Sequence, residues 1–388
     1  MNRERALRFV LLIGVVSFFA DCTYEGSRSI TGQYLATLGA GAAVVAFVSG
    51  LGELLGYGLR LVSGRLSEST GKFWPITLFG YAIQMASVPL LAFAGTWPLA
   101  ALLIVLERIG KATRNPPRDV MLSHAAHEMG YGWGFGVHEA LDQFGALFGP
   151  LVVSAVLAAK AQYRMAFLTL AIPAILTLSL IIAARFIYPR PEDLETSTPT
   201  VAVHGLPHAY WVYLTGAVLV AAGFVDFPLM AFHLQKTGAV PNSWIPIFYS
   251  VAMGVSGLGS LLFGRLFDRT GIRILVALTV LALVAAPLVF FGGFVSALIG
   301  CALWGLGMGV HESIIPAAVA VIVRPERRPS AYGTFTAGYG ICWFLGSVLI
   351  GFLYNVSIPL VVAFSVVAQL AAIPFFMKAS RDIRRIEV

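Results

Sequence analysis

The sequence predicts an all-α membrane protein with twelve transmembrane helices, arranged as two pseudo-symmetric six-helix bundles. Three observations support this fold class. The 388 residues are 58% hydrophobic and only 12% charged, whereas about a quarter of the residues in a soluble protein are charged. Twelve apolar runs are long enough to cross roughly 30 Å of hydrocarbon as helices. A polar motif between two of these runs occurs again near residue 264, which indicates two similar halves.

Each predicted span is an apolar run bounded by polar or charged residues. Helices are expected because the bilayer offers the backbone no hydrogen-bonding partners, and the sequence lacks the alternation typical of β-strands. The mean hydropathy of the chain, +0.83, agrees with a protein that lies mostly in lipid. The spans are expected at residues 9–35, 41–63, 74–94, 97–118, 132–158, 164–188, 208–235, 243–263, 273–292, 294–322, 329–354 and 357–377.

A polar segment between the sixth and seventh spans divides the chain. Residues 189–207 contain proline, serine, threonine and three acids, and they are too few to form a domain. We therefore expect an N-terminal six-helix bundle at 1–188, a linker at 189–207 and a C-terminal six-helix bundle at 208–388.

Basic residues are distributed unequally between the two sides of the predicted membrane. One side carries only Lys160, Arg164 and Lys236. Because basic loop residues remain in the cytoplasm, we expect both termini and the linker to be cytoplasmic in a multi-pass protein of the cell membrane. The isoelectric point near 9.4 then reflects membrane topology, and no nucleic-acid partner is expected. The cytoplasmic basic residues are Arg3, Arg5, Arg8, Arg65, Lys72, Arg118, Arg190, Arg265, Arg269, Arg324, Arg327, Arg328, Lys378, Arg381, Arg384 and Arg385.

The repeated motif occupies the predicted turns at 64–71 and 264–271, and five of its eight positions are identical. Glycines permit a tight turn, and the acid can lie at the positive N-terminus of the following helix. The arginines can pair with the other bundle or with lipid phosphate, so the motif is expected to form a cytoplasmic gate. The alternative is a simple turn that fixes topology. The predicted gating residues are Gly64, Arg65, Glu68, Gly71, Gly264, Arg265, Asp268 and Gly271.

These motifs resemble those of the major facilitator superfamily, and the resemblance covers nearly the whole chain. The two repeats resemble its loop between helices 2 and 3 and the copy between helices 8 and 9. Residues 107–119 resemble a GKxxRxPPRD signature of a poorly characterised prokaryotic branch, and the run at 135–142 resembles the same branch. Gly145, Gly149 and Pro150 resemble the antiporter signature of helix 5. The resemblance implies a secondary transporter that works by alternating access, with its substrate site near the membrane midplane.

Helix 1 carries three charged residues at helical spacing. Asp21, Glu25 and Arg28 share one face, because they are separated by four and three residues. A charge in the membrane interior costs about 2.5–3.5 kcal/mol on insertion scales, so each needs a partner or a function. The two acids repel each other, which favours protonation of one of them. Asp21 is therefore expected to bind protons, and the alternative for Glu25 and Arg28 is an internal salt bridge.

Helices 2, 4 and 5 carry further charges. Arg108, Lys111 and Arg114 follow one side of helix 4, and the last two approach the cytoplasm, where they can snorkel. We expect Asp21, Glu53 and Asp142 to surround Arg108 and Lys111. On helix 5, His138 and Asp142 share a face, with Glu139 beside them; some members of this network are expected to be purely structural.

The second half is poorer in charge. Asp226 precedes a proline in helix 7, and His311 and Glu312 follow three glycines in helix 10. Histidine titrates near neutral pH, so this pair is expected either to carry protons or to form a satisfied buried pair. Trp304, Tyr339 and Trp343 are expected either to line a substrate cavity or to pack the bundle.

Other chemistries lack their motifs. The sequence contains no GxxxxGK[ST] nucleotide loop and no HExxH metal site. His124, His127 and Glu128 fall in a predicted loop that offers too few ligands for a metal. Cys22, Cys301 and Cys342 lie in apolar runs without metal or disulfide spacing. No enzyme activity, cofactor or metal is therefore expected.

The function predicted from these residues is proton-coupled export of a small organic solute by antiport, carried out by a monomer in the lipid bilayer. The alternatives are proton-coupled uptake of an anionic solute, with Arg108 or Lys111 binding the anion, and a membrane-embedded receptor or enzyme. The proton-coupling candidates are Asp21, Glu25, Glu53, Glu139, Asp142, His311 and Glu312. The substrate-cavity candidates are Tyr24, Arg28, Arg108, Lys111, His138, Asp226, Trp304, Tyr339 and Trp343.

Overall fold

The computed structural model describes residues 3–127, 131–160, 162–189, 205–311, 315–323 and 328–387, and this part of the chain contains helices but no strand. The helices, in chain order, are α1 (Arg3–Thr37), α2 (Ala42–Thr70), α3 (Phe73–Leu90), η1 (Leu91–Phe93), α4 (Trp97–His127), α5 (Tyr131–Ala158), α6 (Tyr163–Thr169), α7 (Ala171–Ile187), α8 (His208–Gly223), α9 (Phe227–Thr237), α10 (Ile245–Thr270), η3 (Gly271–Arg273), α11 (Ile274–Leu283), α12 (Ala285–Phe291), α13 (Phe294–Gly309), α14 (Ile315–Ile322), α15 (Arg328–Val356) and α16 (Ile358–Glu387).

These helices account for the twelve predicted spans. Ten segments of the described chain are long and apolar enough to cross a membrane, and the shorter apolar helix α13 belongs to another. The remaining span is α4, which has 31 residues but carries Glu107, Arg108, Lys111 and Arg114 in its middle. The predicted all-α membrane fold is confirmed.

Helix α4 is longer than predicted, because it continues through Pro116 and Pro117 to His127. Proline has no backbone N–H, so Pro116 leaves the carbonyl oxygen of Ala112 without its helical donor. The Ser63 hydroxyl of α2 donates to this oxygen over 3.0 Å. A side chain from a neighbouring helix thus satisfies the carbonyl that the PPRD motif exposes.

The predicted gating turns are mostly helical. Helix α2 continues to Thr70 and α10 to Thr270, so only the final glycine of each motif lies outside its helix. Gly71 and Gly271 have φ angles of +65° and +64°, the left-handed conformation that glycine adopts readily after a helix end. Glu68 therefore lies in the last turn of α2, and not at the N-terminus of α3 as expected. The side chain of Asp268 is outside the described part of the structure.

The described chain forms two compact units. Unit 1 comprises Met1–Gly39, Leu55–Thr198 and Asn242–Ser250, and unit 2 comprises Ala40–Leu54, Pro199–Pro241 and Val251–Val388. Helices α2 and α10 each contribute residues to both units. The division of the sequence into bundles at the 189–207 linker stays a prediction.

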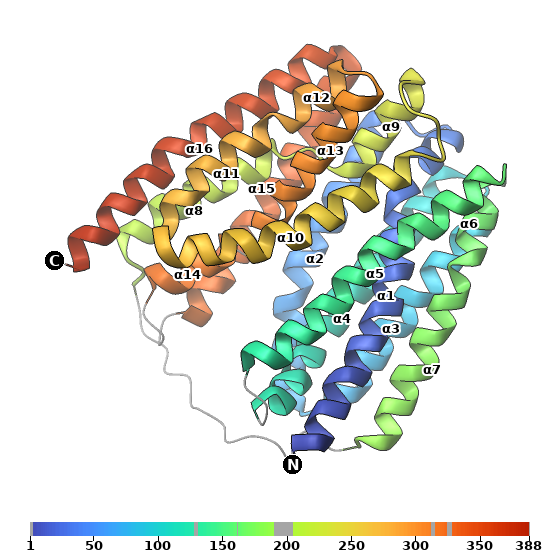
Figure 1. The fold of residues 1–388 in the computed structure, drawn as a ribbon, viewed down its shortest axis with the longest axis horizontal. Coiled ribbons are helices and arrows are strands. Elements are labelled where there is room, and N and C mark those ends of the chain that lie inside the picture. The colour runs from blue at the N-terminus through green and yellow to red at the C-terminus, as the bar shows by residue number, and fades with distance from the viewer. Residues whose placement is uncertain are drawn as a thin grey trace. The chain divides into compact units, whose positions relative to one another are not determined.

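Glycines bring α1 and α5 together in unit 1, where the two helices run side by side (Figure 1). A Cβ atom at Gly145 would collide with the carbonyl oxygen of Phe18, and one at Gly149 with that of Cys22. The GxxxGP motif therefore holds the α5 backbone directly against the α1 segment that carries Asp21. Gly80 of α3 and Gly110 of α4 permit a second close approach of the same kind.

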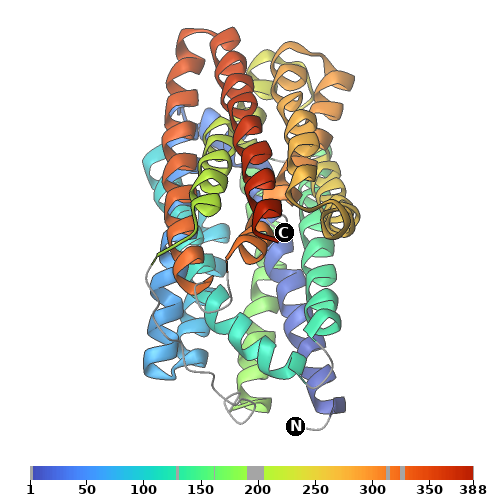
Figure 2. The same cartoon turned by 90° about the vertical axis from the view of Figure 1, so that its left-hand side faces the viewer.

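Unit 2 repeats this packing. Helices α8, α15 and α16 lie side by side (Figure 2). A Cβ atom at Gly346 of α15 would collide with the carbonyl oxygen of Ala222 in α8. The eleventh span thus packs on the seventh as the fifth packs on the first, which is the relation expected of pseudo-symmetric bundles.

The orientation of the chain is tested by cysteine accessibility. Lys72 and Lys236 are both exposed, and the positive-inside rule places Lys72 in the cytoplasm and Lys236 outside. In a Cys342→Ser background, a membrane-impermeant maleimide should modify Lys236→Cys in intact cells and Lys72→Cys only after permeabilisation. The opposite pattern would overturn the predicted orientation of the termini.

Candidate functional site

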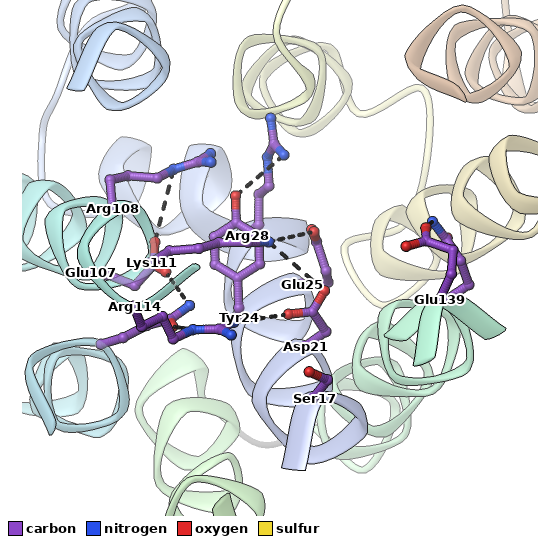
Figure 3. A network of polar contacts seen from close by, with 12 residues as sticks. Ser17, Asp21, Tyr24, Glu25, Arg28, Glu107, Arg108, Lys111, Arg114 and Glu139 are labelled. Carbon is purple, nitrogen blue, oxygen red and sulfur yellow. Dashed lines mark hydrogen bonds and ion pairs between the residues drawn. The ribbon is translucent and has the colours of Figure 1, made fainter. Parts of the chain in front are cut away.

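A line of buried polar residues follows one face of α1. Asp21, Glu25 and Arg28 are 4%, 7% and 6% exposed, and Ser17, one turn before Asp21, is fully buried. Their spacing of three to four residues places them on the same face, as the sequence predicts. This face meets the charged side of α4 (Figure 3).

Lys111 lies at the centre of this arrangement. Its ammonium nitrogen is 3.8 Å from Oδ2 of Asp21 and 3.8 Å from Oε1 of Glu25. It also lies 3.7 Å from the centre of the Tyr24 ring, a distance suited to a cation–π interaction. One cation is thus shared by two acids and an aromatic ring.

Arg114 is fully buried, so it does not snorkel to the cytoplasm. Its guanidinium group donates to Oε1 of Gln84 and, over 3.0 Å, to the hydroxyl of Tyr81. Its Nη2 lies 3.5 Å from Oδ1 of Asp21. A buried arginine that is hydrogen-bonded on several sides is held in one orientation, and here that orientation faces Asp21.

Arg108 lies one turn before Lys111 on α4, toward the N-terminus of that helix. Its Nε is 3.8 Å from Oε2 of Glu107, and its guanidinium carbon lies 4.9 Å from the centre of the Tyr24 ring. Gln84 donates to Oε1 of Glu107 over 2.9 Å, so this amide bridges Glu107 and Arg114. We call Asp21, Tyr24, Glu25, Arg28, Arg108, Lys111 and Arg114 the charged cluster (Figure 3).

A tyrosine of α10 joins the charged cluster from a distant part of the sequence. The hydroxyl of Tyr249 donates to Oε2 of Glu25 over 2.5 Å, and Tyr249 is fully buried. Arg28 donates to the hydroxyl of Tyr24 over 3.4 Å. Both carboxylate oxygens of Glu25 therefore face a partner, Lys111 on one side and Tyr249 on the other.

A second polar group lies one turn below Asp21. The hydroxyl of Ser17 is 2.8 Å from Nε2 of His138, and Arg118 donates to the same hydroxyl oxygen over 3.2 Å. Arg118 also binds Oδ1 of Asp119 through two nitrogens, at 2.7 and 2.9 Å. His138 is thus placed beside α1, but next to Ser17 rather than within the charged cluster.

The predicted acids of α5 differ in position. Asp142 interacts electrostatically with Asp21, Lys111 and Arg118, and its Oδ1 is buried with no hydrogen-bond partner among the described residues. Glu139 is exposed, accepts a hydrogen bond from Gln143 over 3.0 Å, and lies apart from the charged cluster (Figure 3). Asp142, but not Glu139, thus belongs to the surroundings of Asp21.

Unit 2 contains a separate group of predicted residues. Asp226 accepts hydrogen bonds from Nε1 of Trp343 (3.0 Å) and the hydroxyl of Ser347 (2.6 Å). Nδ1 of His311 is hydrogen-bonded to the hydroxyl of Tyr339. Ring contacts that are stacked, tilted or edge-on join Phe224 to Trp304, His311 and Trp343, and join His311, Tyr339 and Trp343 to one another. We call these five residues and Asp226 the aromatic cluster.

The α2 segment that carries Glu53 belongs to unit 2, where Glu53 interacts electrostatically with His311. Its expected place beside Arg108 and Lys111 stays a prediction. Glu312 lies outside the described residues. Arg65 and Glu68 of the predicted gate are exposed. Gly64 lies beside Pro116, so the first gating motif packs against the PPRD motif of α4.

Sequence reasoning missed several hydrogen-bond partners of the charged residues in unit 1. Gln84 and Tyr81 of α3 bind Arg114, Tyr249 binds Glu25, and Ser17 links His138 to Arg118. Gln84 had a usable signal, because an amide in the middle of an apolar span needs hydrogen-bond partners. A tyrosine in an apolar run has no such signal.

The family model described as Major Facilitator Superfamily matches residues 11–347. The chain belongs to the major facilitator superfamily. It is therefore a membrane transporter, and its charged cluster is formed by helices of the first half of this fold.

Two relatives and one solved structure extend this result. An uncharacterised protein of Mycobacterium tuberculosis is 40% identical over 376 residues, covering 95% of this chain and 92% of the relative. An uncharacterised MFS-type transporter of Methanocaldococcus jannaschii is 23% identical over 365 residues, covering 92% and 91%. The crystal structure of the nucleoside transporter NupG superposes with a TM-score of 0.75 at 16% identity, covering 95% of this chain and 99% of that one. The structural likeness supports the shared fold.

Proposed function

We propose that this protein is a secondary active transporter that exports a small organic solute in exchange for protons. The observation that carries the proposal is the sharing of the Lys111 ammonium group by Asp21 and Glu25, at 3.8 Å from each, within membrane helices. Ionised acids this far from water are retained only with a partner or a function. A proton on one acid releases Lys111 to the other, so the cluster has two states that differ by one proton.

The charge balance of the cluster supports coupling. Asp21 and Glu25 face Lys111 and Arg114, and Glu107, next to the cluster, faces Arg108. These three acids balance the three bases only when every acid is ionised. Protonation of one acid leaves an uncompensated cation, which is unfavourable in a low-dielectric interior unless the packing changes. This links proton binding to conformation.

Close packing of α5 on α1 can link a change of protonation in the charged cluster to movement of these helices. Gly145 and Gly149 set the α5 backbone against Phe18 and Cys22 of α1, which lie three residues before Asp21 and directly after it. When protonation changes the ion-pair partners of Asp21, the resulting shift of α1 should therefore alter its contact with α5. Rocking of helices around a central site is the general way in which such transporters alternate access.

A second candidate is proton-coupled uptake of an anionic solute. Arg108 and Lys111 approach the same Tyr24 ring, at 4.9 and 3.7 Å, and their side chains are 11% and 19% exposed. They are thus more accessible than Arg114, and a carboxylate or phosphate could bind both. In this mechanism a proton on Asp21 or Glu25 frees Lys111 for the anion.

Reconstitution distinguishes these mechanisms. The purified full-length protein is placed in liposomes loaded with a solute chosen by a thermal-stability screen, and a pH gradient is imposed. Export by antiport predicts that solute moves against the direction of proton flow, as read by an enclosed pH-sensitive dye, whereas anion uptake predicts movement in the same direction. Solute flux that does not respond to the gradient would overturn proton coupling, and binding without flux would indicate a receptor.

Glu68 tests the proposed gate. An acid in the last turn of a helix is unfavourable, because the C-terminus of the helix dipole is negative. Glu68→Gln should therefore leave thermal stability within about 0.5 kcal/mol of the wild type, as is usual for surface changes, but should slow proton-driven flux. Ser69→Ala, at the exposed neighbouring position, is the matched control and should leave flux unchanged. Unchanged flux in Glu68→Gln would mean that the motif only fixes topology.

A further inference from the structure

The broken seventh span and an irregular turn in the tenth meet at His311. Helix α8 ends at Gly223 and α9 begins at Phe227, and between them Phe224 and Asp226 have extended backbone, with ψ angles of 120° and 140°. After α13, Val310 and His311 form a π turn. The Phe224 and His311 rings lie 4.2 Å apart, so the two irregular segments are in contact.

Dedicated partners maintain the break. The carbonyl oxygen of Val225 accepts a hydrogen bond from Nε1 of Trp304 over 2.8 Å, and that of Gly223 accepts one from the hydroxyl of Ser365 over 2.6 Å. Non-helical backbone at membrane depth occurs where it is buried in protein or lines a cavity, and interrupted helices in transporters mark binding sites. π turns are likewise frequent at functional sites. These interruptions therefore point to a site in the aromatic cluster.

His311 has an unused hydrogen-bonding group. It is 2% exposed, and its Nδ1 is bonded to Tyr339, but its Nε2 is buried with no hydrogen-bond partner among the described residues. Buried polar atoms are nearly always paired, so an unpaired one needs an explanation. If Tyr339 donates to Nδ1, Nε2 carries a free N–H; if His311 donates, Nε2 has a free lone pair.

A second buried histidine in the same unit lacks this feature. His233 also places its Nδ1 against a tyrosine hydroxyl, 2.9 Å from that of Tyr354, and also lies beside a phenylalanine, Phe290. It has a further hydrogen bond with the backbone of Phe290. His233 is within the regular helix α9. In His233, both the tyrosine hydroxyl and a backbone group hydrogen-bond the buried imidazole. The same unit therefore pairs one buried histidine fully and leaves Nε2 of His311 without a partner among the described residues.

We propose that Nε2 of His311 hydrogen-bonds the transported solute, and that this solute is a planar aromatic or heteroaromatic compound with a polar edge. Rings of Phe224, Tyr339 and Trp343 surround His311 at centroid distances of 4.2, 5.9 and 5.2 Å, which suits stacking on a flat ring. Asp226 holds the Trp343 indole in place through its Nε1. His311 is 2% exposed in this structure, so the solute binds when the packing around His311 opens.

This inference rests on the proposed transport function, and binding tests it apart from flux. Thermal stability of the purified full-length protein in detergent is measured with nicotinamide, benzimidazole, indole and quinoline, and with cyclohexanecarboxamide as a saturated counterpart of nicotinamide. At least one aromatic probe should raise the Tm, and the saturated amide should not. Failure of all four aromatic probes, or equal stabilisation by the saturated amide, would overturn the proposed solute class.

Histidine variants test the proposed contact. His311→Phe keeps a flat ring but loses the nitrogen, so the apparent affinity for the stabilising probe should fall about tenfold, the size expected for one hydrogen bond. His233→Phe is the matched control and should change this affinity less than about twofold. His311→Gln restores a polar nitrogen, so it should recover part of the lost affinity. If His311→Phe does not fold, the affinity of His311→Gln for the probe tests the contact instead. Unchanged affinity in both His311 variants would overturn the contact.

The two proposals fail in different ways. Probe binding that depends on His311, together with flux that ignores the pH gradient, would overturn proton coupling and leave the solute site standing. Proton-driven flux of a solute whose binding does not depend on His311 would overturn the solute site alone.

Discussion

Replacement of Asp21 by asparagine is expected to abolish proton-driven solute pumping while exchange of solute for solute continues. The amide has the shape of a protonated carboxyl group but cannot release a proton, so the cluster is fixed in one of its two states. Exchange does not require net proton movement and should therefore continue. No other single substitution in the charged cluster is expected to separate these activities as cleanly.

The structure gives a reason for Asp21→Asn to remain folded. Arg114 keeps its hydrogen bonds to Gln84 and Tyr81, and Lys111 keeps Glu25. The asparagine oxygen can still accept from Arg114, so neither base is left without an acceptor. We expect a modest loss of stability rather than the large loss that follows when a buried charge loses its only partner.

Both activities are measured in proteoliposomes with the same solute, first under a pH gradient and then with equal pH and labelled solute on one side. Glu4→Gln serves as the control, because Glu4 is exposed at the N-terminus of α1 and pairs only with Arg8 among the described residues. If Asp21→Asn still pumps, the coupling acid is another one, with Glu25 and Asp142 next in line. If it does not fold, Asp21 is a structural counter-ion of Arg114 and Lys111.

Residues on one helix could be grouped from sequence alone. The spacing of Asp21, Glu25 and Arg28 placed them on one face, and the steps of three along α4 placed Lys111 and Arg114 on a common side. Helical periodicity is a local property, and a charge in an apolar span needs a partner, so a meeting of these two faces was a sound expectation. The structure brings Lys111 to both acids.

Partners from distant helices could not be predicted in this way. Tyr249 reaches Glu25 across 224 residues of sequence, and nothing in its own helix indicates the register of that contact. Glu53 interacts electrostatically with His311, in the turn that follows α13, a partner that the sequence does not indicate. The break at Phe224–Asp226 was also missed, since Asp226 is a single polar residue in a run that is otherwise apolar enough to continue a helix.

Arg114→Met is expected to give the largest loss of stability in the charged cluster. Arg114 is fully buried and contacts Gln84, Tyr81 and Asp21. Methionine fills much of the same volume but leaves these groups without their donor, and it deprives Asp21 of one of its two bases. Removing one partner of a buried ion pair typically costs about 3–5 kcal/mol. Thermal unfolding of the purified protein in detergent should show this loss, and Arg8→Met, in an exposed pair at the N-terminus, should change stability by less than about 1 kcal/mol.

A double-mutant cycle then separates the role of the ion pair from that of the other hydrogen bonds. If the uncompensated charge of Asp21 causes much of the damage in Arg114→Met, removing that charge as well should restore part of the stability. The variant carrying both Asp21→Asn and Arg114→Met should be more stable than the sum of the single effects predicts, by about 0.5–3 kcal/mol. Strict additivity would mean that the 3.5 Å contact between Asp21 and Arg114 contributes little. The structural role of Arg114 would then come from Gln84 and Tyr81, and Asp21 would be free to exchange its proton without disturbing the arginine.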